Sequence, residues 1–144
     1  MEQDILINLN WNASLESQKR AINDLASMAN INPNTLVQPI GKEYWENAAK
    51  VLVEIGYPRI EVAIPGLFVW LQDLNWPGAI IVMELLKSIP KDVIIRHLES
   101  AANEAVNTDD QIWLINLSTF IAELKIQEDD FTLKELYHTL LNAE

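Results

Sequence analysis

The sequence of 144 residues contains no cysteine, two histidines and four glycines. Without cysteine the chain forms no disulfide, offers no thiol nucleophile and has no thiolate ligand for a metal. His97 and His138 lie far apart and lack the short spacing of a zinc-binding pair. The glycines are too scattered to form a phosphate-binding loop. We therefore expect no metal and no cofactor.

Long apolar runs and basic residues are also scarce. The longest uncharged stretch is shorter than the ~20 apolar residues that a transmembrane helix needs. The first four residues, Met-Glu-Gln-Asp, are acidic and polar, unlike a secretory signal. We therefore expect a cytoplasmic protein. The 21 acidic and 10 basic residues give a formal net charge of -11, which disfavours nucleic acid and membrane surfaces as partners.

The negative charge is concentrated toward the C-terminus. Residues 1–97 carry 8 basic and 11 acidic side chains, whereas residues 98–144 carry 2 basic and 10 acidic ones. Such a field attracts a basic protein, which is one expectation for the partner. The alternative is that the excess acid only keeps a small protein soluble.

Hydrophobic spacing predicts an all-α protein, because no segment shows sustained alternation of polar and apolar residues. The first expected helix follows Ser14 and ends near Asn30. The others span Lys42 to Ile55, Arg59 to Gln72, Asn75 to Pro90, Lys91 to Val106 and Thr108 to Lys125, and the last begins at Asp129 or Asp130. Ser14, Asn75, Thr108 and one of the last two aspartates open their helices in this interpretation. Gly56 ends the helix of residues 42–55. An extended conformation is considered only for residues 5–11.

The most apolar part of the chain lies at residues 64–78. No charged residue interrupts it between Glu61 and Asp73, and the following helix is uncharged until Glu84. Helices that are apolar on every side must be covered on every side. We expect these two helices to form the inside of the fold.

Tryptophan recurs near the start of every second predicted helix, at Trp11, Trp45, Trp76 and Trp113. The spacings are 34, 31 and 37 residues, and the tripeptide Leu-Asn-Trp that ends at Trp11 also ends at Trp76. A period of this length is typical of stacked helix pairs. We expect the indoles to pack at helix corners, and the alternative is an exposed aromatic row that binds a ligand.

The run Trp-Leu-Gln-Asp-Leu-Asn-Trp-Pro-Gly at residues 70–78 resembles a marker of a family of uncharacterised bacterial domains with a HEAT-like, α-solenoid character. The segment from Tyr57-Pro58-Arg59 to the acidic corner at Asp73 is similar to the second helix and turn of a HEAT repeat. The resemblance extends from the first Leu-Asn-Trp to the helix that follows Asp109-Asp110. It implies no known activity.

Together these features predict one all-α domain over residues 1–144, a HEAT-like α-solenoid of about four helix pairs. A compact helical bundle is the alternative. The approximate repeats are 11–40, 42–73, 75–106 and 108–143. The first is degenerate, because its second helix is short or irregular. Amphipathic terminal helices around apolar central ones suit the ends and middle of such an array.

The resemblance implies that the second helices of the pairs line a concave face. The residues expected to bind a partner near that face or at the acidic end are Arg59, Glu61, Arg96, Glu99, Asn103, Glu104, Asp109 and Asp110. Two acidic groups, one at Glu104, Asp109 and Asp110 and one at residues 128–130, contain oxygen ligands for a cation. Neither matches a calcium-binding loop, and helix capping explains both more simply.

No complete catalytic set is present, so we expect a non-enzymatic protein-interaction module that binds another protein. One alternative is an acidic immunity or antitoxin-like protein that neutralises a basic toxin. Another is a small-ligand binder or enzyme with a cleft near His97. The oligomeric state is left open by the sequence.

Overall fold

The computed structural model describes residues 2–144. Its α-helices are α1 (Glu2–Leu6), α2 (Leu15–Ser27), α3 (Trp45–Ile55), α4 (Ile64–Trp70), α5 (Ala79–Lys87), α6 (Lys91–Asn107), α7 (Gln111–Glu123) and α8 (Lys134–Leu141). Short 3-10 helices are η1 (Ile7–Leu9), η2 (Pro33–Leu36), η3 (Lys42–Tyr44), η4 (Glu61–Ala63) and η5 (Glu128–Asp130). Residues 2–144 contain no strand, which confirms the predicted all-α class.

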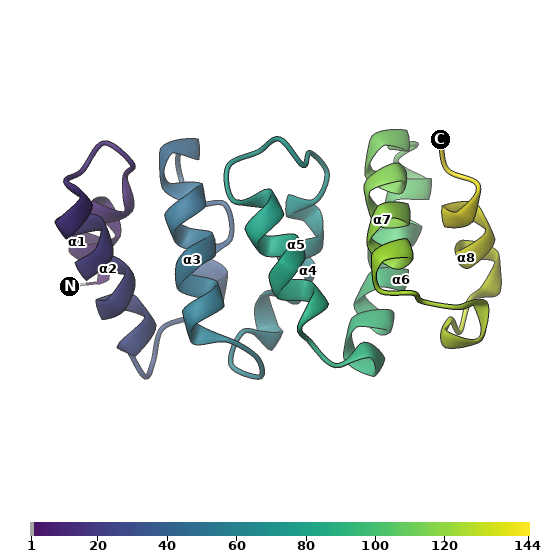
Figure 1. The fold of residues 1–144 in the computed structure, drawn as a ribbon, viewed down its shortest axis with the longest axis horizontal. Coiled ribbons are helices and arrows are strands. Elements are labelled where there is room, and N and C mark those ends of the chain that lie inside the picture. The colour runs from purple at the N-terminus through teal and green to yellow at the C-terminus, as the bar shows by residue number, and fades with distance from the viewer. Residues whose placement is uncertain (1) are drawn as a thin grey trace.

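The helices follow one another along the long axis of the molecule, with the two chain ends at opposite ends (Figure 1). Helix α2 packs against α3, and α3 packs against α5. Helix α4 contacts both α5 and α6, and α6 contacts both α7 and α8. Most packing is therefore between elements that are near in the chain, and the C-terminal third is built on α6.

Two predicted helix ends are confirmed. Ser14 precedes α2, and its Oγ accepts a hydrogen bond of 3.1 Å from the backbone N–H of Ser17. Gly56 follows α3 with a φ of 72°, the left-handed conformation that commonly ends a helix.

Three other predicted caps are wrong, because each helix begins at a different residue than predicted. The backbone of Asn75 donates to Asp73 Oδ1, and α5 begins only after Pro77 and Gly78. Thr108 ends α6, whereas Asp110 caps α7 by accepting from the N–H of Trp113 at 3.0 Å. The carboxylate of Asp130 belongs to a capping box in η5, and α8 begins after Leu133.

The extended conformation considered for residues 5–11 is also wrong. Helix α1 and η1 cover residues 2–9, because this coiling buries Leu9 completely. In α2, Ala21 and Leu25 are buried, whereas Leu15 at the first position of the helix is 73% exposed.

The central helices α4 and α5 supply much of the core. Ile64, Leu67, Phe68 and Trp70 of α4 are fully buried. Helix α5 is not covered on every side as predicted, since Ile80 is 55% exposed.

The tryptophans pack at corners in three of the four predicted places. Trp113 is buried, and the ring of Trp45 meets that of Trp76 edge-on with centroids 5.6 Å apart. Trp11 is 49% exposed, so the expectation of corner packing is wrong for this residue. Its place in the turn before α2 leaves one side of the ring open to solvent.

Two buried asparagines that follow helix-start tryptophans bind backbone carbonyls of earlier elements. Asn47 Nδ2 donates to Leu9 O over 2.8 Å, and Asn116 Nδ2 donates to Leu71 O over 2.7 Å. Both acceptors are carbonyls at or just beyond the end of a short helical segment, where regular helical partners are lacking. The two amides therefore tie α3 and α7 to the preceding part of the chain.

Candidate functional site

One face of α6 carries polar side chains at helical spacing. Asp92, Arg96, Glu99 and Asn103 succeed one another at intervals of three or four residues, which places them along one side of the helix. Ile95 lies among them and is nearly buried. This side of α6 faces the segment that contains η5 and leads into α8.

A groove of about 900 Å³ lies between that face and the η5 segment, and we call it the α6 groove. Its lining residues are Lys91, Asp92, Ile95, Arg96, Glu99, Ser100, Asn103, Asp129, Asp130, Thr132 and Leu133. The groove combines side chains of both charges with an apolar base. Its volume is typical of a ligand-binding cleft.

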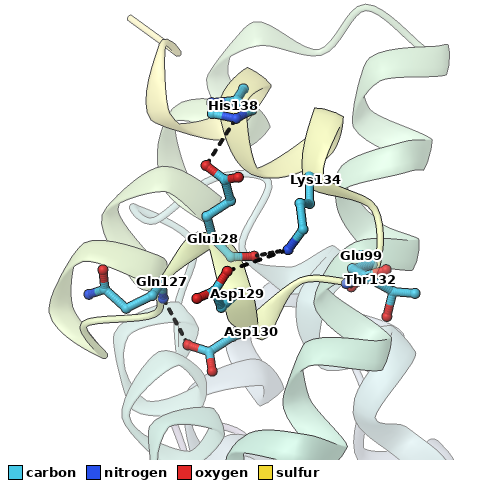
Figure 2. Close-up of polar contacts among 8 residues, drawn as sticks. All are labelled: Glu99, Gln127, Glu128, Asp129, Asp130, Thr132, Lys134 and His138. Atoms are coloured by element: carbon cyan, nitrogen blue, oxygen red, sulfur yellow. Dashed lines mark hydrogen bonds and ion pairs between the residues drawn. The ribbon is translucent and has the colours of Figure 1, made fainter.

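Glu99 fixes the two walls of the groove to each other. Its Oε1 accepts a hydrogen bond of 2.6 Å from the backbone N–H of Thr132, and the side chains lie together in Figure 2. Glu99 is 8% exposed, and no hydrogen bond or ion pair within residues 2–144 uses its Oε2. A charged group in such a place needs polar partners, because burial without them is costly.

Asp130 forms the rim of the groove beside η5. Its Oδ2 accepts from the N–H of Gln127 at 2.8 Å and pairs with Lys91 Nζ at 3.2 Å. The backbone hydrogen bond from Gln127, with a smaller effect of Lys91, lowers the pKa of this carboxyl below its usual value. Asp130 is therefore ionised and holds the start of α6 against η5.

The η5 segment, which forms the wall of the groove opposite α6, is linked to α8 by further polar contacts, drawn in Figure 2. His138 Nε2 lies 3.2 Å from Glu128 Oε2, and Lys134 Nζ lies 3.7 Å from Asp129 Oδ1. Lys134 also donates to the carbonyl oxygen of Glu128 at 3.3 Å. Exposed pairs of this kind contribute little stability, so the wall depends mainly on the buried Phe131 and Leu136.

A second hollow of about 540 Å³ adjoins the α6 groove. It shares Asn103, Thr132 and Leu133 with the groove and continues toward Val106 and Leu136. Leu133 is 52% exposed and Val106 is 42% exposed. The adjoining hollow is therefore more apolar than the groove itself.

The structure brings three of the predicted partner-binding residues into the groove: Arg96, Glu99 and Asn103. Glu61 lies at its edge, 3.9 Å from the guanidinium of Arg96. Arg59 lies apart from them, and its guanidinium donates to the carbonyl oxygen of Met28 at 2.9 Å.

The other three predicted residues lie elsewhere. Glu104 borders a small cavity beside His97. Asp109 and Asp110 form the turn between α6 and α7, where Asp109 has a φ of 53° and Asp110 caps α7. Three of the eight residues therefore line the α6 groove, and the other five lie outside its lining.

The cavity beside His97 has a volume of about 110 Å³ and is lined partly by Pro65, Val69 and Trp113. Within residues 2–144, His97 Nε2 is buried without a hydrogen-bond partner. Burial, followed by the neighbouring Arg96, lowers the pKa of His97 below its usual value. The cavity is much smaller than the ~300 Å³ or more of a typical small-molecule site.

Several groove residues were missed by the sequence analysis. Asp92 and Ile95 have the helical spacing to Glu99 that would have identified them. Thr132 and Leu133 offer no such signal, because they reach the groove only through the packing of the η5 segment on α6.

The two acidic groups considered as cation ligands do not gather into a metal site. Within the described part of the chain, no group of three or more histidine or acidic side chains is arranged to hold a metal ion. None of the helices in residues 2–144 combines the length and apolar character needed to cross a bilayer.

Fold and site together define an all-helical protein with a groove along one long helix. The chain belongs to the family DUF5071, a domain of unknown function, which matches residues 41–144. This confirms the expected membership of a family of uncharacterised domains, although the match begins later and ends later than the resemblance indicated. No curated protein and no solved structure matches the chain.

Proposed function

We propose that the protein is a non-enzymatic protein-interaction module and that the α6 groove holds a segment of its partner. The observation that carries this proposal is the groove itself, with a volume of about 900 Å³ and a lining of polar, charged and apolar side chains. Such a mixed lining suits a peptide, whose backbone and side chains also combine polar and apolar groups.

We further propose a basic protein as the partner and the cytoplasm as the place of action, without nucleic acid or membrane binding. Residues 98–144 carry 10 acidic and 2 basic side chains, and this part of the chain forms most of α6 and all of α7, η5 and α8. Its field accelerates the approach of a basic protein and slows that of an acidic one.

A HEAT-like array of about four helix pairs is the arrangement we propose for the whole chain. The near-neighbour packing of the helices supports it, as do the matching contacts of Asn47 and Asn116. In such an array the binding surface is formed along the second helices of the pairs. Helix α6 takes that role in the third pair.

The experiment that tests the binding site is site-specific photocrosslinking. A photoreactive amino acid replaces Ser100, which lines the groove, or Glu54, which is exposed on α3. We expect a discrete crosslinked partner from the native cytoplasm only with the probe at position 100. Equal crosslinking from both positions, or crosslinking only from position 54, would contradict the groove as the binding site.

An immunity or antitoxin-like role is a second candidate. It is favoured by the exposed carboxylates of the C-terminal end, such as Asp109 and Asp129, which suit the masking of a basic toxin. Co-expression with the product of a neighbouring gene tests it. Rescue of growth from a toxic, basic neighbour supports the role, and a harmless neighbour contradicts it.

A further inference from the structure

The α6 groove and the adjoining hollow lie next to each other along α6, because Asn103, Thr132 and Leu133 line both, and we call the two together the channel. Helix α6 has 17 residues and is therefore about 25 Å long. An extended chain advances about 3.3 Å per residue, so a segment of about seven or eight residues would follow the whole helix.

The channel has different chemistry at its two ends. Near the start of α6 it is lined by the carboxylates of Asp92, Asp129 and Asp130 and by the basic side chains of Lys91 and Arg96. Asp130 pairs with Lys91, Asp129 pairs with Lys134, and Arg96 pairs with Glu61 outside the channel, so within residues 2–144 Asp92 is the one of these three carboxylates without an ion pair. Near the end of α6 it is lined by Val106, Leu133 and Leu136. Lys134 and Glu135 also line this end, and their opposite charges give it no net charge. One end therefore favours a cation and the other an aliphatic side chain.

Glu99 lies between these ends and is suited to anchor a cation. One carboxylate oxygen is held by the N–H of Thr132, which orients the group, and within residues 2–144 the other oxygen has no hydrogen bond. Glu99 is 8% exposed, yet its second oxygen is not fully buried and is therefore accessible from the channel. A guanidinium donates several hydrogen bonds in a plane and matches a carboxylate geometrically.

We propose that this channel binds an extended segment of the partner protein with an arginine near Asp92 and Glu99 and aliphatic residues near Leu133 and Val106. This inference rests on the proposed function and adds the chemistry of the bound segment. It assigns specificity to two places: the unpaired oxygen of Glu99 and the exposed apolar surface of Leu133.

The test uses synthetic octapeptides and the intact, isotope-labelled protein. The probe peptide has two arginines at one end, two leucines at the other, and alternating serine and glycine between them; a second probe has the reverse order. One control peptide carries glutamate in place of arginine, and another carries serine in place of leucine. Amide chemical shifts are followed during titration, and the dissociation constants are fitted.

Glu99→Gln is the principal variant, because glutamine keeps an acceptor for Thr132 and removes only the charge. Glu54→Gln makes the same charge change on α3, outside the channel. Asp92→Asn is a second, exposed variant that leaves the buried carboxylate in place. We expect one probe to bind about tenfold more weakly to Glu99→Gln and severalfold more weakly to Asp92→Asn, with Glu54→Gln unchanged.

The expected shifts lie in α6 and in residues 128–139 and disappear with either control peptide. Equal affinity of Glu99→Gln and Glu54→Gln, or equal binding of the glutamate peptide, overturns the inference. If the crosslinked partner occupies the groove but neither probe binds, the channel chemistry is wrong while the proposed function stands. If the partner crosslinks only outside the groove, the proposed function is wrong, and so is the channel inference that rests on it.

Discussion

Trp113 and Phe68 are joined by a buried hydrogen bond, in which the indole Nε1–H donates to the carbonyl oxygen of Phe68 over 3.0 Å. The two residues lie 45 positions apart in the chain. Phe68 is in the last turn of α4, where carbonyls lose regular helical partners. Trp113 therefore supplies both buried apolar area and a specific polar link between α7 and α4.

Trp113→Phe should lower the free energy of unfolding by about 2 kcal/mol, through loss of this hydrogen bond and the space left by the smaller ring. Urea unfolding followed by circular dichroism measures the change. Trp11→Phe is the matched control, because Trp11 is 49% exposed, and it should cost less than about 0.5 kcal/mol. Similar costs for both variants would contradict the assigned role of Trp113.

Gly78→Ala should destabilise the protein by about 2 kcal/mol or more, since a left-handed residue with a side chain costs about 1–2 kcal/mol. Gly78 has a φ of 83°, and an added Cβ would lie 2.9 Å from both Trp45 O and the ring of Trp70. Thermal unfolding measures the effect. Gly41→Ala is the control, because its added methyl group meets only the flexible side chain of Glu43. A Gly78→Ala protein as stable as the control would exclude the close approach.

His97 should titrate below the usual pKa of a histidine, which is about 6.5. Because the pKa is lowered in the folded state, the unfolded chain binds the proton more readily. The contribution of neutral His97 to stability is therefore complete above about pH 6.5 and is lost as the pH falls through the folded-state pKa. Ring-proton NMR across pH 4 to 8 measures this pKa directly.

His97→Gln provides the control for that pH dependence. The stability of the wild-type protein should fall more steeply than that of the variant as the pH is lowered below about 6.5. A His97 pKa at or above the usual value would refute the effect of burial. So would parallel stability curves for the two proteins.

Replacement of Asp109, Asp110, Asp129 and Asp130 by asparagine should slow association with the crosslinked partner more than it speeds dissociation. Asparagine preserves the fold, because it also caps helices and tolerates the φ of 53° at position 109. Stopped-flow association across a salt series is the measurement. Added salt should slow the wild-type reaction and affect the variant less. Association that ignores both salt and the four substitutions would mean that these charges serve solubility only.

Local rules predicted the parts of the fold that depend on neighbouring residues. The apolar periodicity identified the helices, and Ser14 and Gly56 were correctly placed at the ends of α2 and α3. The caps at Asn75 and Thr108 were wrong because turns in this chain contain several adjacent polar residues, any of which satisfies the same local rule. Only the path of the backbone selects among them.

For the candidate site too, the sequence related residues within one helix but not residues on separate helices. Arg96, Glu99 and Asn103 were predicted together because they share one helix and one spacing. Arg59, which was grouped with them, instead binds the carbonyl of Met28. Helical spacing relates residues within one helix, but it does not show how separate helices are rotated toward one another.

The sequence by itself determined the all-helical class, the acidic C-terminal end and the absence of thiol chemistry, because composition and periodicity are properties of the chain alone. Only the tertiary structure decided that η5 packs on α6 and that Glu99 receives the N–H of Thr132. This contact joins residues 33 positions apart, and its formation depends on the burial of Phe131 and Leu136. The groove follows from that packing, since neither of its walls encloses a groove without the other.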